Sequence, residues 1–252
     1  MITWVFSEHH VPTFWEVYLA FFGLALNVLL AALAWVVYIA LEPYVRRRRP
    51  QVLVSWTRVL SGELTDSLVG RDVLIGCAFG AVFSVLDQMT VLAPGWFGKP
   101  SELSIASVPL LAHPAAALQS ANGNFALFLS LWMLFLLFLL QTLLRRDWLA
   151  ASVLTLALSI FATQSSAPWV EAAVLILYQG LGVFLLMRFG LLALIVSAYV
   201  DNIFDTFPMT LQTSAWYSSL GFVGLFIVLA ITVYGFRISL GSRPMIAVSA
   251  ED

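Results

Sequence analysis

The chain has 252 residues, of which 61% are hydrophobic and 10% are charged, and its formal net charge is -2 at pH 7. Soluble domains carry about 25% charged residues, so this composition excludes an ordinary soluble protein and indicates a polytopic membrane protein. The net charge gives no indication of a nucleic-acid partner. Cys77 is the single cysteine, which excludes an intramolecular disulfide.

Seven apolar segments are candidate membrane spans, because a helix needs about 20 apolar residues to cross the hydrocarbon core. In chain order they cover about residues 14–41, 73–93, 125–144, 148–167, 170–187, 189–207 and 216–236. The sixth is the least apolar, since Asp201, Asn202 and Asp205 fall near its end. We therefore expect a single all-α integral membrane domain over residues 1–252.

The basic residues alternate along the chain in a way that predicts its orientation. Arginines follow the first, third, fifth and seventh segments, whereas Lys99 is the one basic residue on the other side. Lys and Arg resist translocation, so loops that carry them stay in the cytoplasm. We expect an external N-terminus, a cytoplasmic C-terminus and insertion into a bacterial cytoplasmic membrane. Merging the fifth and sixth segments would put Arg188 inside the membrane and Arg237 on the wrong side.

The connection after the first span is the most basic part of the chain. Its arginines are Arg46, Arg47, Arg48, Arg49, Arg58 and Arg71. Residues 51–61 place apolar side chains, including Trp56, at helical spacing, which predicts a short helix lying on the cytoplasmic leaflet. The arginines and Trp56 are candidates for binding a partner subunit or anionic lipids, at about 1 kcal/mol per arginine. Topology determination alone explains the arginines equally well.

Ionisable residues within predicted spans are functional candidates because their burial is costly. Asp87, next to Gln88 near the external end of the second span, would suit a proton or ion relay, or simply reach water at the interface. Asp201 and Asp205 are four residues apart and are candidate cation ligands. Cations such as calcium take about six to eight oxygens, so a hydrated helix end explains this pair better.

Three histidines are expected on the external side: His9, His10 and His113. Imidazole could bind zinc, a haem iron or a chlorophyll magnesium there, but adjacent histidines point to different faces in regular structure. Hydrogen bonds to the backbone or to lipid headgroups explain them more simply. We expect no intrinsic cofactor, with a lipid or a chlorophyll-type pigment at an interface as the candidate ligand.

The sequence has no HExxH, GxSxG, paired CxxC or GxxxxGK[ST] motif, so we expect no enzymatic activity. Several short motifs are spread along most of the chain. They are HHVPT (9–13), LEPYVRRR (41–48), SW (55–56), LVGRDVL (68–74), RFGLL (188–192), SAWY (214–217) and YGF (234–236). In this order they resemble the C-terminal membrane region of acidobacterial-type serine/threonine protein kinases. LEPYVRRR and LVGRDVL are the motifs most specific to this family, whereas the hydrophobic stretches between the motifs would match many membrane proteins.

The resemblance implies a membrane module without catalytic function, in which LEPYVRRR anchors the end of the first span. It also implies that Asp72 acts near a helix N-terminus, against the helix dipole. We expect no kinase domain in this chain, and therefore no phosphorylation by it. The expected function is a non-catalytic accessory or scaffold subunit, with membrane lipids and other integral membrane subunits as partners.

The lineage implied by the resemblance includes phototrophs, which favours a photosynthetic reaction centre as the larger complex. The alternative is a small transporter, or a membrane sensor that signals to a separate kinase. Transporters tend to show internal repeats and interrupted helices at the midplane, and neither pattern is evident in the sequence.

Overall fold

The computed structural model describes residues 14–98, 123–162, 168–210, 212, 214–215 and 218–241. Every regular element in these ranges is a helix, so the all-α prediction is confirmed. The elements are α2 (Phe14–Arg48), η1 (Pro50–Val52), α3 (Val54–Leu60), α4 (Ser67–Trp96), α7 (Asn124–Leu144), α8 (Asp147–Ala162), α9 (Pro168–Arg188), α10 (Leu191–Thr206) and α11 (Ser218–Ser239).

Five of these helices are long and apolar enough to cross a membrane: α2, α4, α7, α9 and α11. This indicates a multi-pass membrane protein, as the composition predicts. The remaining two long helices, α8 and α10, each have 16 residues. Each of the seven predicted segments overlaps one helix, and the differences lie at the ends. α2 continues through Pro43 to Arg48, for example, and α4 begins at Ser67.

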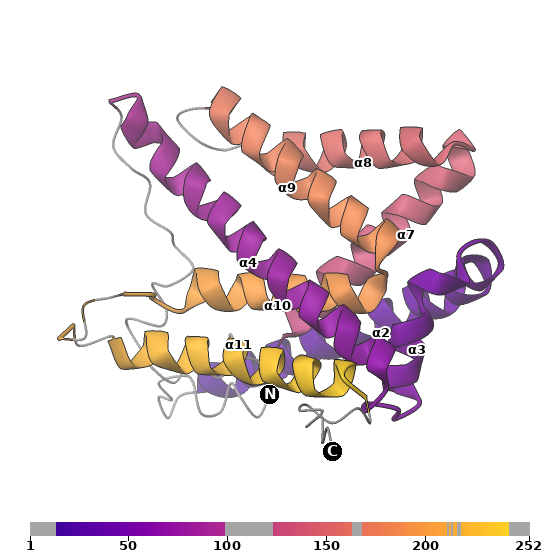
Figure 1. Cartoon of the computed structure of the whole chain (residues 1–252), viewed down its shortest axis with the longest axis horizontal. Coiled ribbons are helices and arrows are strands. Elements are labelled where there is room, and N and C mark those ends of the chain that lie inside the picture. Colours follow the sequence, from indigo (N-terminus) through magenta and orange to yellow (C-terminus); the bar gives the residue numbers. More distant parts are fainter. Residues whose placement is uncertain are drawn as a thin grey trace, which may run out of the picture.

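The central helix is α10, which packs against α4, α7, α9 and α11 (Figure 1). Side chains on several of its faces are buried, including Leu191, Ala193, Val200 and Ile203. Protein therefore surrounds much of this helix. A helix covered in this way tolerates polar residues better than one that faces lipid, because other helices can satisfy them.

Small residues allow α4 to approach α10 closely. A Cβ atom added at Gly76 would lie 2.8 Å from the carbonyl oxygen of Ala193, and one at Gly80 would lie 2.8 Å from that of Ser197. The two glycines are four residues apart on one helix face, the GxxxG spacing that brings helices into close contact in membranes. The contact between α4 and α10 is the most extensive one between two elements.

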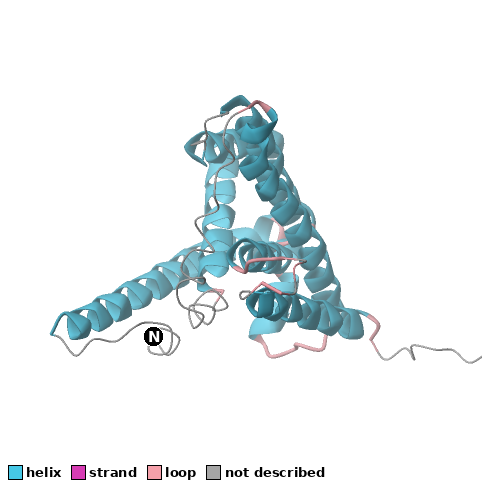
Figure 2. Cartoon of the chain, turned by 90° about the vertical axis from the view of Figure 1, so that its left-hand side faces the viewer, coloured by secondary structure: helices cyan, strands magenta, loops and turns pink. Residues whose placement is uncertain are grey.

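In contrast, α2 is only loosely attached to the other helices. Figure 2 shows it extending away from them, and its packing is against α7 and η1. Leu41 and Val45, near its C-terminal end, are buried, whereas only 6% of its most apolar window is buried inside the structure. At about 1.5 Å per residue its 35 residues extend roughly 52 Å, more than the roughly 30 Å of a hydrocarbon core.

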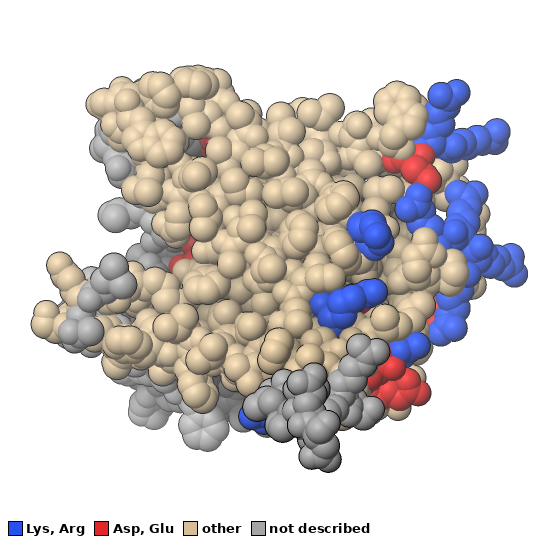
Figure 3. All heavy atoms as spheres, viewed as in Figure 1, with Lys and Arg blue, Asp and Glu red and all other residues tan. Residues whose placement is uncertain are grey.

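The described basic residues gather on one side of the molecule, which we call the arginine side. It carries Arg46, Arg47, Arg48, Arg49, Arg58, Arg71, Arg145, Arg146, Arg188 and Arg237. In Figure 3 most of the basic side chains of the visible face lie toward the right, whereas the charged groups visible at the left edge are acidic. The ends of α2, α7, α9 and α11 and the starts of α4, α8 and α10 lie toward that side in Figure 1.

Candidate functional site

Several of the short sequence motifs lie far apart in the chain, and the structure brings them together on the arginine side. Ser55 of the SW motif donates a short hydrogen bond from Oγ to Oδ2 of Asp72, in LVGRDVL. Arg71 donates from Nε and Nη2 to the other oxygen, Oδ1, at 2.9 and 2.8 Å. Asp72 is only 1% exposed, so this carboxylate joins α3 to α4 from inside the protein.

The start of α4 shows which acidic residue lies at the N-terminus of the helix. Asp66 is the N-cap residue, and its carboxylate accepts a hydrogen bond of 2.8 Å from the amide of Leu68. Asp66 also forms an ion pair with Arg58, whose guanidinium lowers the pKa of this carboxyl. The position next to the helix dipole therefore belongs to Asp66, and Asp72 lies farther along the helix, facing α3.

Three glycines of the same motifs lie at close backbone contacts. Gly190 has a φ of +102°, and an added Cβ would lie 2.6 Å from the carbonyl oxygen of Val52. Gly70 of α4 faces Gly235 of α11, where an added Cβ would lie 2.8 Å from the Gly235 carbonyl oxygen. Only glycine fits these positions without displacing backbone. Tyr234 adds a hydrogen bond of 2.8 Å to the carbonyl oxygen of Leu64.

We call these residues the signature core: Ser55, Gly70, Arg71, Asp72, Gly190, Tyr234 and Gly235. Its members come from α3, α4, α11 and the connection between α9 and α10. Each one contacts backbone or completes a hydrogen bond to another element or to Asp72. Such an arrangement holds helix ends in a defined relative position, which is a structural task.

The helix expected at residues 51–61 forms as η1 and α3, and it packs on the protein. Val52 and Leu53 are almost completely buried, and Trp56 packs against two hydrophobic clusters. The indole Nε1 of Trp56 is buried and has no hydrogen-bond partner among the described residues. Part of the apolar face that we expected on the lipid leaflet is thus covered by the chain itself.

The arginines at the C-terminal end of α2 and directly after it differ in their partners. Arg46 forms an ion pair of 2.7 Å with Glu42 one turn earlier, and Arg48 lies over the ring of Tyr44. Arg49 reaches α8, where it forms an ion pair with Asp147. That pair joins two basic connections that are 98 residues apart in the sequence.

Carboxylates from two predicted spans come together on the side opposite the arginines. Asp87 on α4 and the pair Asp201 and Asp205 on α10 are close enough for their charges to interact. Tyr178 of α9 donates a hydrogen bond of 2.5 Å to Oδ2 of Asp201, while Oδ1 is buried without a partner among the described residues. Sequence reasoning missed Tyr178, because nothing in the sequence relates it to Asp201.

The remaining candidate residues do not join this acidic group. Gln88 is exposed on α4, although its neighbour Asp87 is half-buried. His9, His10 and His113 lie outside the described residues. No group of three or more His, Cys, Asp or Glu residues suited to a metal ion occurs within the described ranges. Asp201 and Asp205 are therefore not part of such a ligand group among the described residues.

The fold and these sites define an all-helical protein of the multi-pass membrane class, with a structural core on the arginine side and an acidic group opposite. No family model, curated protein or solved structure matches the chain.

Proposed function

We propose that this protein is a non-catalytic accessory subunit of a larger bacterial membrane complex, and that α2 binds its neighbours in that complex. The observation that carries the proposal is the exposure of α2: its apolar window is only 6% buried, against 44% for α4. Helices associate in membranes through close packing, and α2 packs little on its own chain. Little of the described chain covers its surface, which is therefore suited to packing against helices of another subunit.

A polar residue in the exposed part of α2 supports the same proposal. Asn27 lies in the apolar stretch, where its Nδ2 donates a hydrogen bond of 2.7 Å to the carbonyl oxygen of Gly23. Asparagine side chains hydrogen-bond between helices in membranes, typically contributing about 0.6 to 2 kcal/mol. Where α2 diverges from α7, Asn27 also lines a cleft of about 290 Å³. A partner helix that enters this cleft would meet both the amide and the open surface at Gly23.

The expected result is that the wild-type chain, purified from its native membrane in a mild detergent, retains other integral membrane subunits, identified by mass spectrometry. Gly23→Leu combined with Asn27→Leu should reduce their recovery about tenfold or more, because bulky side chains would obstruct close helix packing. Ala230→Leu is the matched control, since Ala230 is exposed on α11. It should leave recovery unchanged.

An absorption spectrum of the same preparation tests the finer proposal that the complex is a photosynthetic reaction centre. Chlorophyll-type absorption that co-purifies with the wild-type chain, and is lost together with its partners in the α2 variant, is the expected result. A monodisperse, partner-free preparation would contradict the accessory role. It would favour the alternative, a small transporter or a sensor for a separate kinase, in which Asp87, Asp201 and Tyr178 occupy the pathway.

We further propose seven spans, with the arginine side in the cytoplasm and the N-terminus outside. The gathering of arginines on one side supports this orientation. At 16 residues, α8 and α10 are roughly 24 Å long, somewhat short of the hydrocarbon core. Local thinning of the bilayer accommodates such short spans at modest cost, and α10 is largely surrounded by protein.

Cysteine labelling tests this topology in a Cys77→Ser background. An impermeant maleimide should label Gln212→Cys in intact spheroplasts, but should label Ser61→Cys and Arg188→Cys only after permeabilisation. These three native side chains are exposed. Labelling of Arg188→Cys from outside would mean that α8 does not cross the membrane, and reversed labelling of the other two would contradict the orientation.

A further inference from the structure

A long open groove lies between α8 and α9 on the surface of the bundle. Its volume is about 710 Å³, within the range of about 300 to 1,000 Å³ that is usual for ligand pockets. The floor contains Gly180, where an added Cβ would meet only a methyl group of Thr155, at 3.7 Å. The groove thus has room for a ligand that lies along the two helices.

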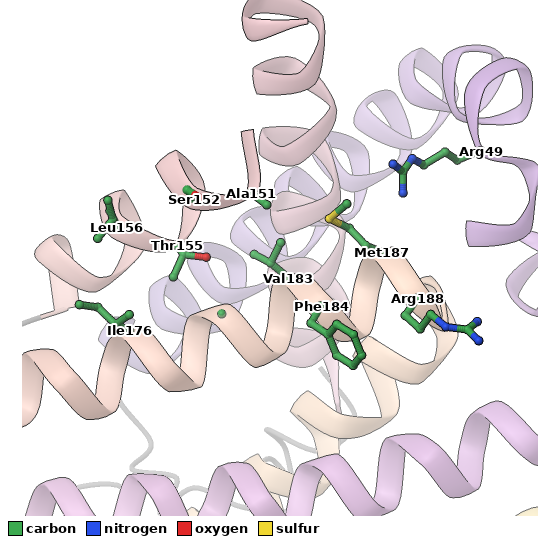
Figure 4. Close-up of a pocket in the computed structure, with 11 residues that line it drawn as sticks. Arg49, Ala151, Ser152, Thr155, Leu156, Ile176, Val183, Phe184, Met187 and Arg188 are labelled. Atoms are coloured by element: carbon green, nitrogen blue, oxygen red, sulfur yellow. The ribbon is translucent and has the colours of Figure 1, made fainter. Parts of the chain in front are cut away.

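The two ends of the groove differ in polarity (Figure 4). Leu156 of α8 and Ile176 of α9 lie at one end, and the guanidinium groups of Arg49 and Arg188 lie at the other. Most of the remaining lining is apolar, with Val183 and Phe184 between the ends. A ligand that fits this groove has an apolar body and an anionic group at one end.

Both arginines retain donors for such an anionic group. Arg49 uses Nη2 for its ion pair with Asp147, and a guanidinium has five N–H donors. Arg188 lies with its guanidinium 5.5 Å from the ring centre of Phe189 and has no carboxylate partner among the described residues. Guanidinium groups bind phosphate oxygens through paired hydrogen bonds, so a phosphate suits this end of the groove.

The length of the groove along α9 favours a lipid over a transmembrane helix as the ligand. From Arg188 back to Ile176 is 12 residues of α9, or roughly 18 Å at about 1.5 Å per residue. One leaflet contributes about half of the roughly 30 Å hydrocarbon core. A lipid anchored at the arginines would fill the groove to about the bilayer midplane, whereas a partner helix would need the full thickness.

We propose that the groove binds one anionic phospholipid, with its phosphate between Arg49 and Arg188 and an acyl chain along α8 and α9 toward Leu156 and Ile176. Basic pockets between spans on the cytoplasmic side are typical sites for anionic headgroups. The inference rests on the proposed topology, in which α8 and α9 cross the membrane with the arginine side in the cytoplasm. It does not depend on the accessory role or on a pigment.

Native mass spectrometry of the full-length chain tests the site directly, after delipidation and reconstitution with phosphatidylglycerol or, separately, phosphatidylcholine. The wild type should retain one phosphatidylglycerol, and much less phosphatidylcholine. Arg49→Gln combined with Arg188→Gln should weaken retention of phosphatidylglycerol about tenfold or more, because charge-assisted hydrogen bonds are lost. Gly180→Leu should have a similar effect by filling the groove while leaving both arginines in place.

The matched control is Arg47→Gln combined with Arg237→Gln, which removes the same charge from the same side but outside the groove. It should retain phosphatidylglycerol like the wild type. An equal loss of bound phosphatidylglycerol in both double variants would show that only the net charge matters, and would overturn the proposal. Unchanged retention in Gly180→Leu would overturn it as well. A dimer that Gly180→Leu abolishes, with no bound lipid in the wild type, would assign the groove to a second copy instead. Displacement by millimolar inorganic phosphate would also overturn the acyl-chain assignment.

Discussion

Replacing Gly80 with leucine is expected to cost more stability than any comparable change on the outside of the bundle. Gly80 and Gly76 are the small residues through which α4 approaches α10, the helix at the centre of the fold. At Gly80 an added Cβ would lie 2.7 Å from the Cβ of Val200 and 2.8 Å from the carbonyl oxygen of Ser197. A backbone oxygen cannot move aside as a flexible side chain can.

We expect Gly80→Ala to lower the free energy of unfolding by about 1 to 3 kcal/mol, the usual cost of overpacking. Gly80→Leu should go further and separate α4 from α10. Equilibrium unfolding in mixed micelles, followed by circular dichroism, measures both. Gly23→Ala and Gly23→Leu are the matched controls, because no atom lies within 4 Å of an added Cβ at that position. Equal costs at Gly23 and Gly80 would show that helix propensity, and not packing, governs the effect.

The second large effect is expected at Asp72. Asp72→Ala removes the acceptor of hydrogen bonds from Ser55 and Arg71, and it leaves the hydroxyl of Ser55 in a buried position. Bonds to charged groups contribute about 1.5 to 3 kcal/mol each, but the side chain of Arg71 is 55% exposed, so water weakens its share. The expected loss is about 2 to 4 kcal/mol.

A double-mutant cycle separates this network from simple loss of volume. Asp72→Ala and Ser55→Ala together should cost about 1 kcal/mol less than the sum of the single changes, because each change already breaks their shared hydrogen bond. Glu42→Ala, which removes an exposed ion pair with Arg46, is the control and should cost less than about 1 kcal/mol. Strict additivity at Asp72 and Ser55 would contradict the buried bond.

The signature core shows a structural role for several of the short sequence motifs. Asp72 and Ser55 join α3 to α4, Gly70 and Gly235 allow α4 to meet α11, and Gly190 allows the connection before α10 to lie against Val52. These contacts hold the helix ends on the arginine side together. None of the signature-core residues lines the groove between α8 and α9 or belongs to α2, so a stable scaffold presents the two proposed binding surfaces.

Several features could be read from the sequence because they depend on local composition. Few charges and long apolar runs predict helices in a membrane, since only a helix satisfies the backbone of such a segment internally. The arginines at alternate connections predict one basic side, and the described arginines do gather there. Asp66 was missed, although an aspartate directly before Ser67 is a typical N-cap signal that could have moved the expected start of α4.

Only the tertiary structure decided which helix faces meet. A soluble helix shows its buried face by the spacing of apolar residues, whereas a membrane helix is apolar all round, because both lipid and protein interior accept such side chains. The sequence therefore could not predict that α10 lies at the centre, that α2 packs only loosely on the other helices, or that Tyr178 contacts Asp201. Those arrangements depend on shape, above all on where glycines let two backbones approach, and shape exists only once the helices have packed.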